Sequence, residues 1–142
     1  MIRPMEDDAW TLLLDLVMTE RARLPQIAAE FELSPVQLHV LRLLEPGCPV
    51  AMGRLAGALG CDASNVTGIV DRLEARGLVE RRSGQGDRRV RVLVVTELGA
   101  RVRSSALARM SQPPSRIAAL SPSDRRALAA ILRRALTAEA AG

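Results

Sequence analysis

The residues best suited to chemistry in this chain are three small polar side chains followed by an arginine. Ser64, Asn65 and Thr67 lie within four positions, and Gly68 and Arg72 follow on the same segment. Hydroxyl, amide and guanidinium groups bond to base edges, and at the front of a helix they suit a DNA major groove entered N-terminus first. A glycine among them would let the helix approach the DNA backbone closely. Taken alone, however, the segment is more typical of an ordinary surface helix.

Cationic residues lie further along the chain, between two β-rich runs. Residues 78–82 and 90–95 are rich in β-forming side chains, and the Gly-containing segment 83–89 between them carries positive charge. This pattern predicts a β-hairpin with a longer loop. Arg82 and Arg88 are candidates for phosphate contacts, because a guanidinium group pairs well with phosphate oxygens.

A helix over residues 63–76 would hold the first group of polar residues in place. Asp62 before it is a good N-cap, and Gly77 after it is a good C′ residue. Apolar residues recur at helical spacing and predict one buried stripe opposite the polar face. The stripe consists of Val66, Ile69, Val70 and Leu73.

A shorter helix is expected just before it, over residues 52–60. It ends at Gly60, and only a few residues separate the two helices. Two helices joined by a tight, Gly-containing turn form the helix-turn-helix pattern. A basic hairpin after this unit makes it a winged helix, and Pro49 and Val50 before it are expected to add a short strand to the sheet.

These segments resemble the DNA-binding core of the MarR family of bacterial transcription regulators. The matching pieces are residues 55–56, 64–67, 70–74, 77–79, 87–89 and 96–99. Weaker similarity covers nearly the whole chain. The resemblance implies a homodimer that binds a palindromic operator in double-stranded DNA. Such proteins are usually repressors, often released by a small-molecule effector or by oxidation.

The resemblance also implies roles for residues of the wing. Arg89 matches the position whose side chain enters the minor groove, and the narrow, negative minor groove of A·T tracts favours an inserted arginine. Asp87 matches the acidic partner of that arginine, and a simple turn residue is an equal alternative. The expected DNA-binding residues are therefore Ser64, Asn65, Thr67, Gly68, Arg72, Arg82, Asp87, Arg88 and Arg89.

The expected fold class is mainly α with a small antiparallel β-hairpin, in one MarR-like domain over residues 1–142. The winged-helix core is expected over about 34–96, flanked by dimerisation helices over about 7–31 and 97–138. The first of these helices carries more leucine than one small core needs, which favours a partner subunit. Burial within the monomer is the alternative. Candidate seam residues are Leu13, Val17, Leu132 and Leu136.

Local signals predict where the other helices start. Pro25 is expected to bend or restart the N-terminal helix. Ser34 and Pro35 begin a helix that runs to Glu45. Thr96 is expected to cap a helix reaching about residue 110, and Ser121 with Pro122 begins the last one.

Composition narrows the classes of partner. Formal net charge is +4, and all 20 basic residues are arginine, either for phosphate contact or through a genome-wide bias against lysine. Residues 1–33 hold seven acids and three arginines, a net of −4. The remaining nine acids and seventeen arginines give +8, so the basic part is expected to meet phosphate. Only Trp10 and Phe31 are aromatic, which favours duplex DNA over single strands.

Other functions find little support in the sequence. No Gly-rich phosphate loop or metal spacing occurs, so we expect neither an enzyme, a cofactor nor a metal. No secretory signal or membrane span is expected, which predicts a cytoplasmic protein. Two alternatives stay open, a winged helix that binds protein and a redox-sensing regulator. The second would use Cys48 or Cys61, although two reduced, partly buried thiols are the default.

Overall fold

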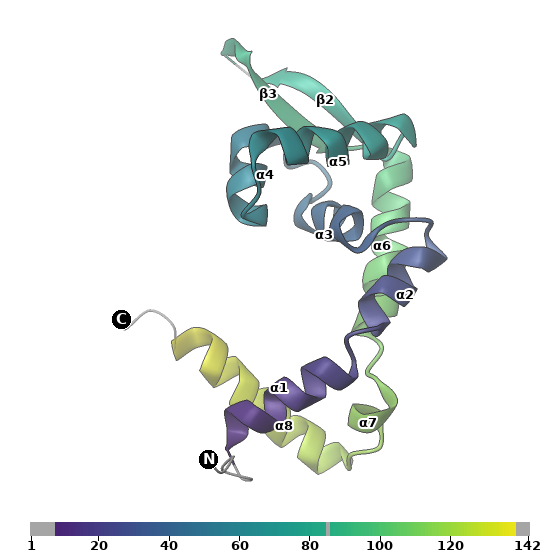
Figure 1. Cartoon of the computed structure of the whole chain (residues 1–142), viewed down its shortest axis with the longest axis vertical. Helices are drawn as coiled ribbons and strands as arrows, with labels where there is room; N and C mark the ends of the chain where they lie inside the picture. Colours follow the sequence, from purple (N-terminus) through teal and green to yellow (C-terminus); the bar gives the residue numbers. More distant parts are fainter. Residues whose placement is uncertain (1–7, 85, 139–142) are drawn as a thin grey trace, which may run out of the picture. The chain divides into compact units, whose positions relative to one another are not determined.

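The computed structural model of this chain describes residues 8–84 and 86–138 (Figure 1). The chain forms two compact units, residues 1–110 and 111–142. The expected fold class, mainly helical with a small antiparallel sheet, is confirmed. The single domain over 1–142 stays a prediction. The elements are α1 (Ala9–Thr19), α2 (Arg23–Glu30), α3 (Pro35–Leu43), β1 (Val50–Ala51), α4 (Met52–Leu59), α5 (Ala63–Ala75), β2 (Val79–Gly84), β3 (Asp87–Val95), α6 (Glu97–Ser111), α7 (Ser115–Ala118) and α8 (Pro122–Thr137).

The N-terminal helical segment is interrupted, as its proline predicted. α1 ends at Thr19 and α2 begins at Arg23, so Pro25 lies in the first turn of α2. A proline is tolerated there because its missing N–H has no partner within the helix. The Asp8 side chain caps α1 by accepting a hydrogen bond from the Trp10 N–H at 3.3 Å. The predicted start at residue 7 lies outside the described residues.

α3 begins as expected but ends earlier. The Ser34 side chain accepts from the Gln37 N–H at 3.2 Å, and the Gln37 side chain accepts from the Ser34 N–H at 2.9 Å. This reciprocal pair is a capping box. The prediction that the helix runs to Glu45 was wrong by two residues. Leu44 is already extended, which fits the bias of the chain against helix just before Pro46.

The helix-turn-helix has its predicted boundaries. α4 ends at Leu59 and is capped by Gly60, whose φ of 61° is a left-handed conformation that favours glycine. α5 follows and ends before Gly77, whose φ is 71°. Asp62 occupies the N-cap position of α5, but its side chain makes no capping hydrogen bond. The apolar stripe of α5 is confirmed, with Val66, Val70 and Leu73 buried and Ile69 half-buried.

The three strands form an antiparallel sheet in the order β1-β3-β2. The short strand expected near Val50 is therefore present, and it pairs with Leu93 of β3. The prediction of a longer loop over 83–89 was wrong. β2 continues to Gly84 and β3 starts at Asp87, which pairs with Gly84. Small and polar residues permit both strand and loop, so composition alone placed the end of the first strand too early and the start of the second too late.

One apolar core fills the space among the helices and the sheet of the first unit. Its fully buried large residues come from three helices or their flanks and from two strands: Leu38, Val40, Leu41, Leu44, Leu55, Val66, Val70, Leu73, Leu78, Val79 and Leu93. α5 contributes one side of its cylinder to this core. Its opposite side remains in solvent, and that side carries the polar residues singled out by the sequence.

A tight junction joins the end of α5, β2 and the start of α6. The Thr96 hydroxyl accepts from the Gly99 N–H at 3.0 Å, which confirms the predicted cap, and it donates to the Gly77 carbonyl. The Thr96 N–H donates to the Leu78 carbonyl at 3.1 Å. Gly99 is buried directly against that carbonyl, so α6 starts in contact with the backbone that ends the helix-turn-helix.

The candidate dimerisation helices expose apolar side chains. α1 has no buried residue, and Leu13 and Val17 are 37% and 53% exposed. α8 starts at the predicted Ser121 cap and also has none, with Leu132 and Leu136 at 37% and 76%. The short helix α7 was not foreseen from the sequence. Within residues 8–84 and 86–138, no helix combines the length and apolar character needed to cross a membrane.

Candidate nucleic-acid interface

Four of the predicted DNA-binding residues lie together on the solvent side of α5. Ser64, Asn65, Gly68 and Arg72 are exposed and line one hollow of about 370 Å³. We call these four residues the reading face. Gly68 follows Ser64 by four positions and Asn65 by three, and Arg72 follows Gly68 by four, which places them along one side of the helix, opposite the buried stripe. The structure therefore brings together the side chains that the sequence selected as candidates.

Two residues of the reading face, Arg72 and Gly68, have side-chain positions that make no contact stabilising the described fold. The Arg72 side chain makes no hydrogen bond or ion pair with any residue that the structure describes, so its guanidinium fork is available to a ligand. A Cβ added at Gly68 would meet nothing within 4 Å, and its φ is not positive. Glycine weakens a helix interior by roughly 0.5–1 kcal/mol relative to alanine. No packing among the described residues explains that cost, whereas close approach of a partner would.

Thr67 lies beside the reading face but is partly engaged within the helix. Its hydroxyl donates to the Ala63 carbonyl one turn earlier, at 3.0 Å, and the residue is exposed. A threonine bonded in this way keeps lone pairs on its hydroxyl oxygen as acceptors. It can therefore accept a hydrogen bond from a base edge, but its proton is already committed.

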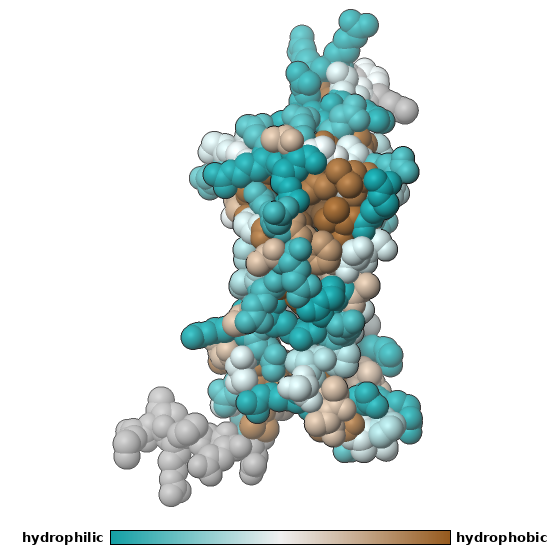
Figure 2. Space-filling view, turned by 90° about the vertical axis from the view of Figure 1, so that its right-hand side faces the viewer, coloured by the Kyte–Doolittle hydropathy of each residue, from teal (hydrophilic) through white to brown (hydrophobic). Residues whose placement is uncertain are grey.

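The wing carries the second set of candidates. β2 and β3 extend beyond α5 (Figure 1), and the surface at their tip is hydrophilic on the face shown in Figure 2. Arg88 and Arg89 are exposed on β3. Arg82 on β2 is also exposed and forms a 3.2 Å ion pair with Glu80. Asp87 begins β3 opposite Gly84, so its backbone belongs to the strand rather than to a loop.

Arg81 joins the wing to the reading helix, and sequence reasoning missed it. From β2 its guanidinium donates to Asp71 at 2.6 Å and to Glu74 at 2.7 Å, both on α5. Its backbone N–H donates to the other Glu74 oxygen at 3.0 Å, and the guanidinium also reaches the Thr67 carbonyl at 3.4 Å. These bonds fix the angle between α5 and β2. Nothing in the sequence separates Arg81 from its neighbour Arg82, because both are cations on a strand.

Other arginines also stabilise the fold rather than await a ligand. Arg76 donates to the carbonyls of Glu32 and Phe31 at 2.7 and 3.0 Å. Arg103 of α6 donates to the Leu41 and Arg42 carbonyls, which are orphan acceptors at the end of α3. Since several arginines are bonded within the fold, the number of arginines in the sequence is not the number available to contact DNA.

Two carboxyl groups that bind arginines, those of Glu74 and Glu30, have pKa values shifted from their ordinary values. The pKa of Glu74 lies below its ordinary value, first because the Arg81 N–H donates to it and then through the guanidinium, against the opposing effect of burial. The pKa of Glu30 is lowered chiefly by its hydrogen bonds from Arg109, at 2.6 and 2.7 Å. For Arg81, desolvation opposes the charge, but bonds to Asp71 and Glu74 raise its pKa overall.

We expect the hydrogen bonds from Arg81 to Glu74 to make the stability of the fold depend on pH. A carboxyl whose folded pKa is depressed stabilises the fold above its unfolded pKa of about 4.3, and that contribution is lost as pH falls through the folded value. Glu74→Gln should therefore lower the free energy of unfolding at pH 7, with the difference from the parent shrinking toward pH 3. Urea titrations at several pH values measure this. Glu97→Gln, at a highly exposed surface pair, is the control. A difference for Glu74→Gln that is constant with pH would contradict the assignment.

The two cysteines and the histidine form no cluster. Cys48 is exposed, whereas Cys61 is half-buried and its thiol lies 3.4 Å from the Leu59 carbonyl. His39 is half-buried at the edge of the core, with its Nδ1 3.5 Å from the Arg42 guanidinium. Among the described residues, no group of three or more metal-ligating side chains comes together. The alternative of a redox-sensing thiol gains no support from these contacts.

Sequence comparison identifies the segment that carries this interface. Residues 33–90 match the model of the MarR family. The uncharacterized HTH-type transcriptional regulator YfiV of Bacillus subtilis is 32% identical over 94 residues, covering 65% of this chain and 58% of the relative. The HTH-type transcriptional repressor NicR of Pseudomonas putida is 36% identical over 75 residues, covering 53% and 48%. The chain thus spans about half the length of the curated relatives it matches.

Structure comparison extends the likeness to nearly the whole chain. Apo wild-type MarR from E. coli has a TM-score of 0.75 at 22% identity, covering 96% of this chain and 99% of that one. MepR of S. aureus in complex with DNA has a TM-score of 0.64 at 21% identity, covering 93% and 99%. BpsR of Bordetella bronchiseptica, whose DNA binding is regulated by 6-hydroxynicotinic acid, has 0.70 at 23%, covering 99% of both. These likenesses establish the fold.

Proposed function

Because residues 33–90 match the model of the MarR family, we propose that this chain is a member of that family and a regulator of transcription that binds double-stranded DNA sequence-specifically. The observation that carries the proposal is the reading face of α5, exposed in full beside a basic wing. The two curated relatives are both described as transcriptional regulators, not as enzymes. A regulator of this kind acts where bacterial DNA is held, in the cytoplasm.

The two parts of the interface would read DNA differently. The reading face would enter the major groove, where base edges carry a distinct pattern of donors and acceptors. Arg89 would enter the minor groove, whereas Arg82 and Arg88 would bind phosphates and set the register. The hydrogen bonds from Arg81 to Glu74 and Asp71 would hold the two parts at a fixed angle, so that both can bind one duplex. The solved complex of MepR with DNA supports duplex DNA as the partner.

We further propose that the protein acts as a homodimer on a palindromic operator. One reading helix contacts only a few base pairs, and specific affinities on the order of 10 nM usually need two half-sites. The exposed apolar side chains of α1 and α8 supply the material for a two-fold interface. Such a dimer would separate its reading helices by about one DNA turn, roughly 34 Å. Repression, the role named for NicR, and release by a small-molecule effector belong to the same proposal; the regulation of BpsR's DNA binding by 6-hydroxynicotinic acid supports the second.

Replacing Arg72 tests base reading. If its guanidinium forks onto a guanine, Arg72→Ala should weaken operator binding by roughly 1–3 kcal/mol and relax sequence preference at that position. Operators can first be found by selecting bound duplexes from a random pool. Gel shifts with a selected operator and a scrambled duplex then measure the change. Arg101→Ala, which removes an exposed arginine on α6, is the matched control. If Arg72→Ala binds both duplexes like the parent, the role given to Arg72 is wrong.

Replacing Arg89 tests the wing. Loss of one cation from the minor groove should weaken binding to all duplexes and reduce the slope of log affinity against log salt by about one unit. Titrations of Arg89→Ala at several salt concentrations measure the slope. Arg72→Ala serves as the contrast, because its effect should depend on sequence. An unchanged slope would show that Arg89 does not contact DNA. If the parent chain binds no duplex in gel shifts, the alternative of a winged helix that binds protein would be favoured.

A further inference from the structure

The hollow at the reading face has an apolar side as well as a polar one. Besides the four residues of the reading face, it is lined by Cys61 and Ile69. Both side chains are half-buried and pack against the core of the first unit. The periodicity of the sequence assigned Ile69 only to the buried stripe, whereas part of its side chain is open to the hollow. The surface that would face DNA is therefore partly apolar.

Neither of these two side chains is suited to a strong hydrogen bond with DNA. Ile69 has only hydrocarbon atoms, and the Cys61 thiol donates to the Leu59 carbonyl at 3.4 Å. A free cysteine behaves as a small apolar side chain with a weak S–H donor. In the major groove the base pairs present hydrogen-bond donors and acceptors, and the 5-methyl group of thymine is the apolar group among them. An apolar contact in this groove therefore selects thymine.

The residues around Cys61 and Ile69 leave this apolar surface accessible. Gly68 precedes Ile69 and has no side chain, and a Cβ there would meet nothing within 4 Å. Asn65 lies four positions before Ile69 on α5, so it borders the same surface. The amide of asparagine can form two hydrogen bonds to adenine. Because the two bases of a pair share one major-groove edge, a thymine methyl group lies next to the adenine atoms that Asn65 is suited to contact.

We propose that Cys61 and Ile69 contact the 5-methyl group of a thymine in the operator and so determine sequence preference at that base pair. This inference rests on the proposed function, and it adds two residues to those expected to contact bases. The methyl group would enter the hollow of about 370 Å³ through the space left open at Gly68. Removing one methyl group from such a contact should lower affinity about fourfold.

Replacing thymine by deoxyuridine tests the contact, because it removes the 5-methyl group and keeps every hydrogen-bonding atom of the base. Each thymine of a selected operator is replaced in turn, and gel shifts give the ratio of affinity for the thymine duplex to affinity for the uracil duplex. For the parent chain this ratio should be about fourfold at the contacted position. In Ile69→Ala and in Cys61→Ala the ratio should fall toward unity, because the methyl group loses its partner. Ile69→Val, which keeps a branched side chain, should retain most of the ratio.

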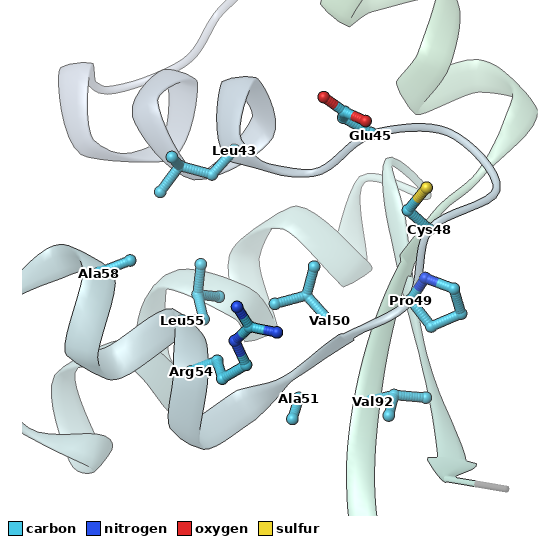
Figure 3. Close-up of a pocket in the computed structure, with 10 residues that line it drawn as sticks. All are labelled: Leu43, Glu45, Cys48, Pro49, Val50, Ala51, Arg54, Leu55, Ala58 and Val92. Carbon is cyan, nitrogen blue, oxygen red and sulfur yellow. The ribbon is translucent and has the colours of Figure 1, made fainter. Parts of the chain in front are cut away.

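The ratio distinguishes a base contact from an effect on the fold. Both side chains pack against the core, so truncating either one also lowers the free energy of unfolding. A smaller folded fraction weakens binding to both duplexes equally, and it leaves the ratio unchanged. Val50→Ala is the matched control, since Val50 is a half-buried apolar residue in a hollow beside β1 that shares no residue with the reading face (Figure 3). It should keep the parent's ratio.

Three results would overturn the thymine contact and leave the proposed function intact, because the operator would still be bound. The first is a parent chain that binds its operator equally well with uracil at every position. The second is a ratio that stays at the parent's value in both Ile69→Ala and Cys61→Ala. The third is a ratio that falls as far in Val50→Ala as in those two variants. A parent chain that binds no duplex at all would refute the proposed function, and the thymine contact with it.

Discussion

Gly99→Ala should strongly destabilise the fold of this protein, although it adds only one methyl group. A Cβ at Gly99 would lie 1.9 Å from the Leu78 carbonyl oxygen and 2.8 Å from its carbon. Both are backbone atoms, so no side-chain rotation relieves the overlap. Leu78 is itself 1% exposed, and it follows Gly77 in the turn that ends α5. We expect a loss on the order of 3 kcal/mol in the free energy of unfolding, at the upper end for overpacking of a core.

Comparison of Gly99→Ala with a second glycine-to-alanine variant distinguishes a steric clash from the helix preference of alanine. Gly99 lies within α6 and does not have a positive φ, so alanine would otherwise favour the helix. Gly57→Ala is the matched control, since a Cβ there meets nothing within 4 Å in α4. It should raise the free energy of unfolding by roughly 0.5–1 kcal/mol. Thermal and urea unfolding at one protein concentration compare the variants. A Gly99→Ala protein as stable as the parent would show that α6 does not rest on the Leu78 carbonyl.

The second large effect concerns the proposed dimer. Leu136 is 76% exposed on α8, so Leu136→Glu removes little buried surface within the described fold. If Leu136 lies at the subunit seam, a carboxylate there would have to be desolvated on association, and dimers should dissociate at micromolar concentration. Operator affinity should then fall by about a hundredfold or more, because the two half-sites no longer share one molecule. Sedimentation and gel shifts measure the two effects.

A matched charge on the same helix provides the control. Ala130→Glu adds a carboxylate to α8 at another exposed position, off the stripe that carries Leu132 and Leu136. It should leave both the sedimentation coefficient and operator binding close to those of the parent. If Leu136→Glu remains dimeric, the seam does not include this position. A parent chain that is monomeric and occupies each half-site independently would refute the two-fold architecture.

The sequence was sufficient for most of the elements, because the signals for them are local. Helix caps, turn glycines and apolar periodicity act within about eight residues, so Ser34, Gly60 and Thr96 could be assigned without tertiary information. The same periodicity placed Ser64, Asn65, Gly68 and Arg72 on one exposed face. The length of the wing tip was not determined in this way, because serine and glycine at 83–84 are compatible with either a strand or a loop.

Only the tertiary structure decided which arginines are free to bind a ligand. The sequence presents twenty equivalent cations, and their partners lie far away along the chain. Arg76 is 44 residues from the carbonyl of Glu32, and Arg109 is 79 residues from Glu30. The same holds for Gly99, whose need for glycine arises from a carbonyl 21 positions earlier. Packing creates these pairings, so no local pattern reveals them. Once they are assigned, Arg72 on α5 is among the arginines whose side chains have no partner among the described residues.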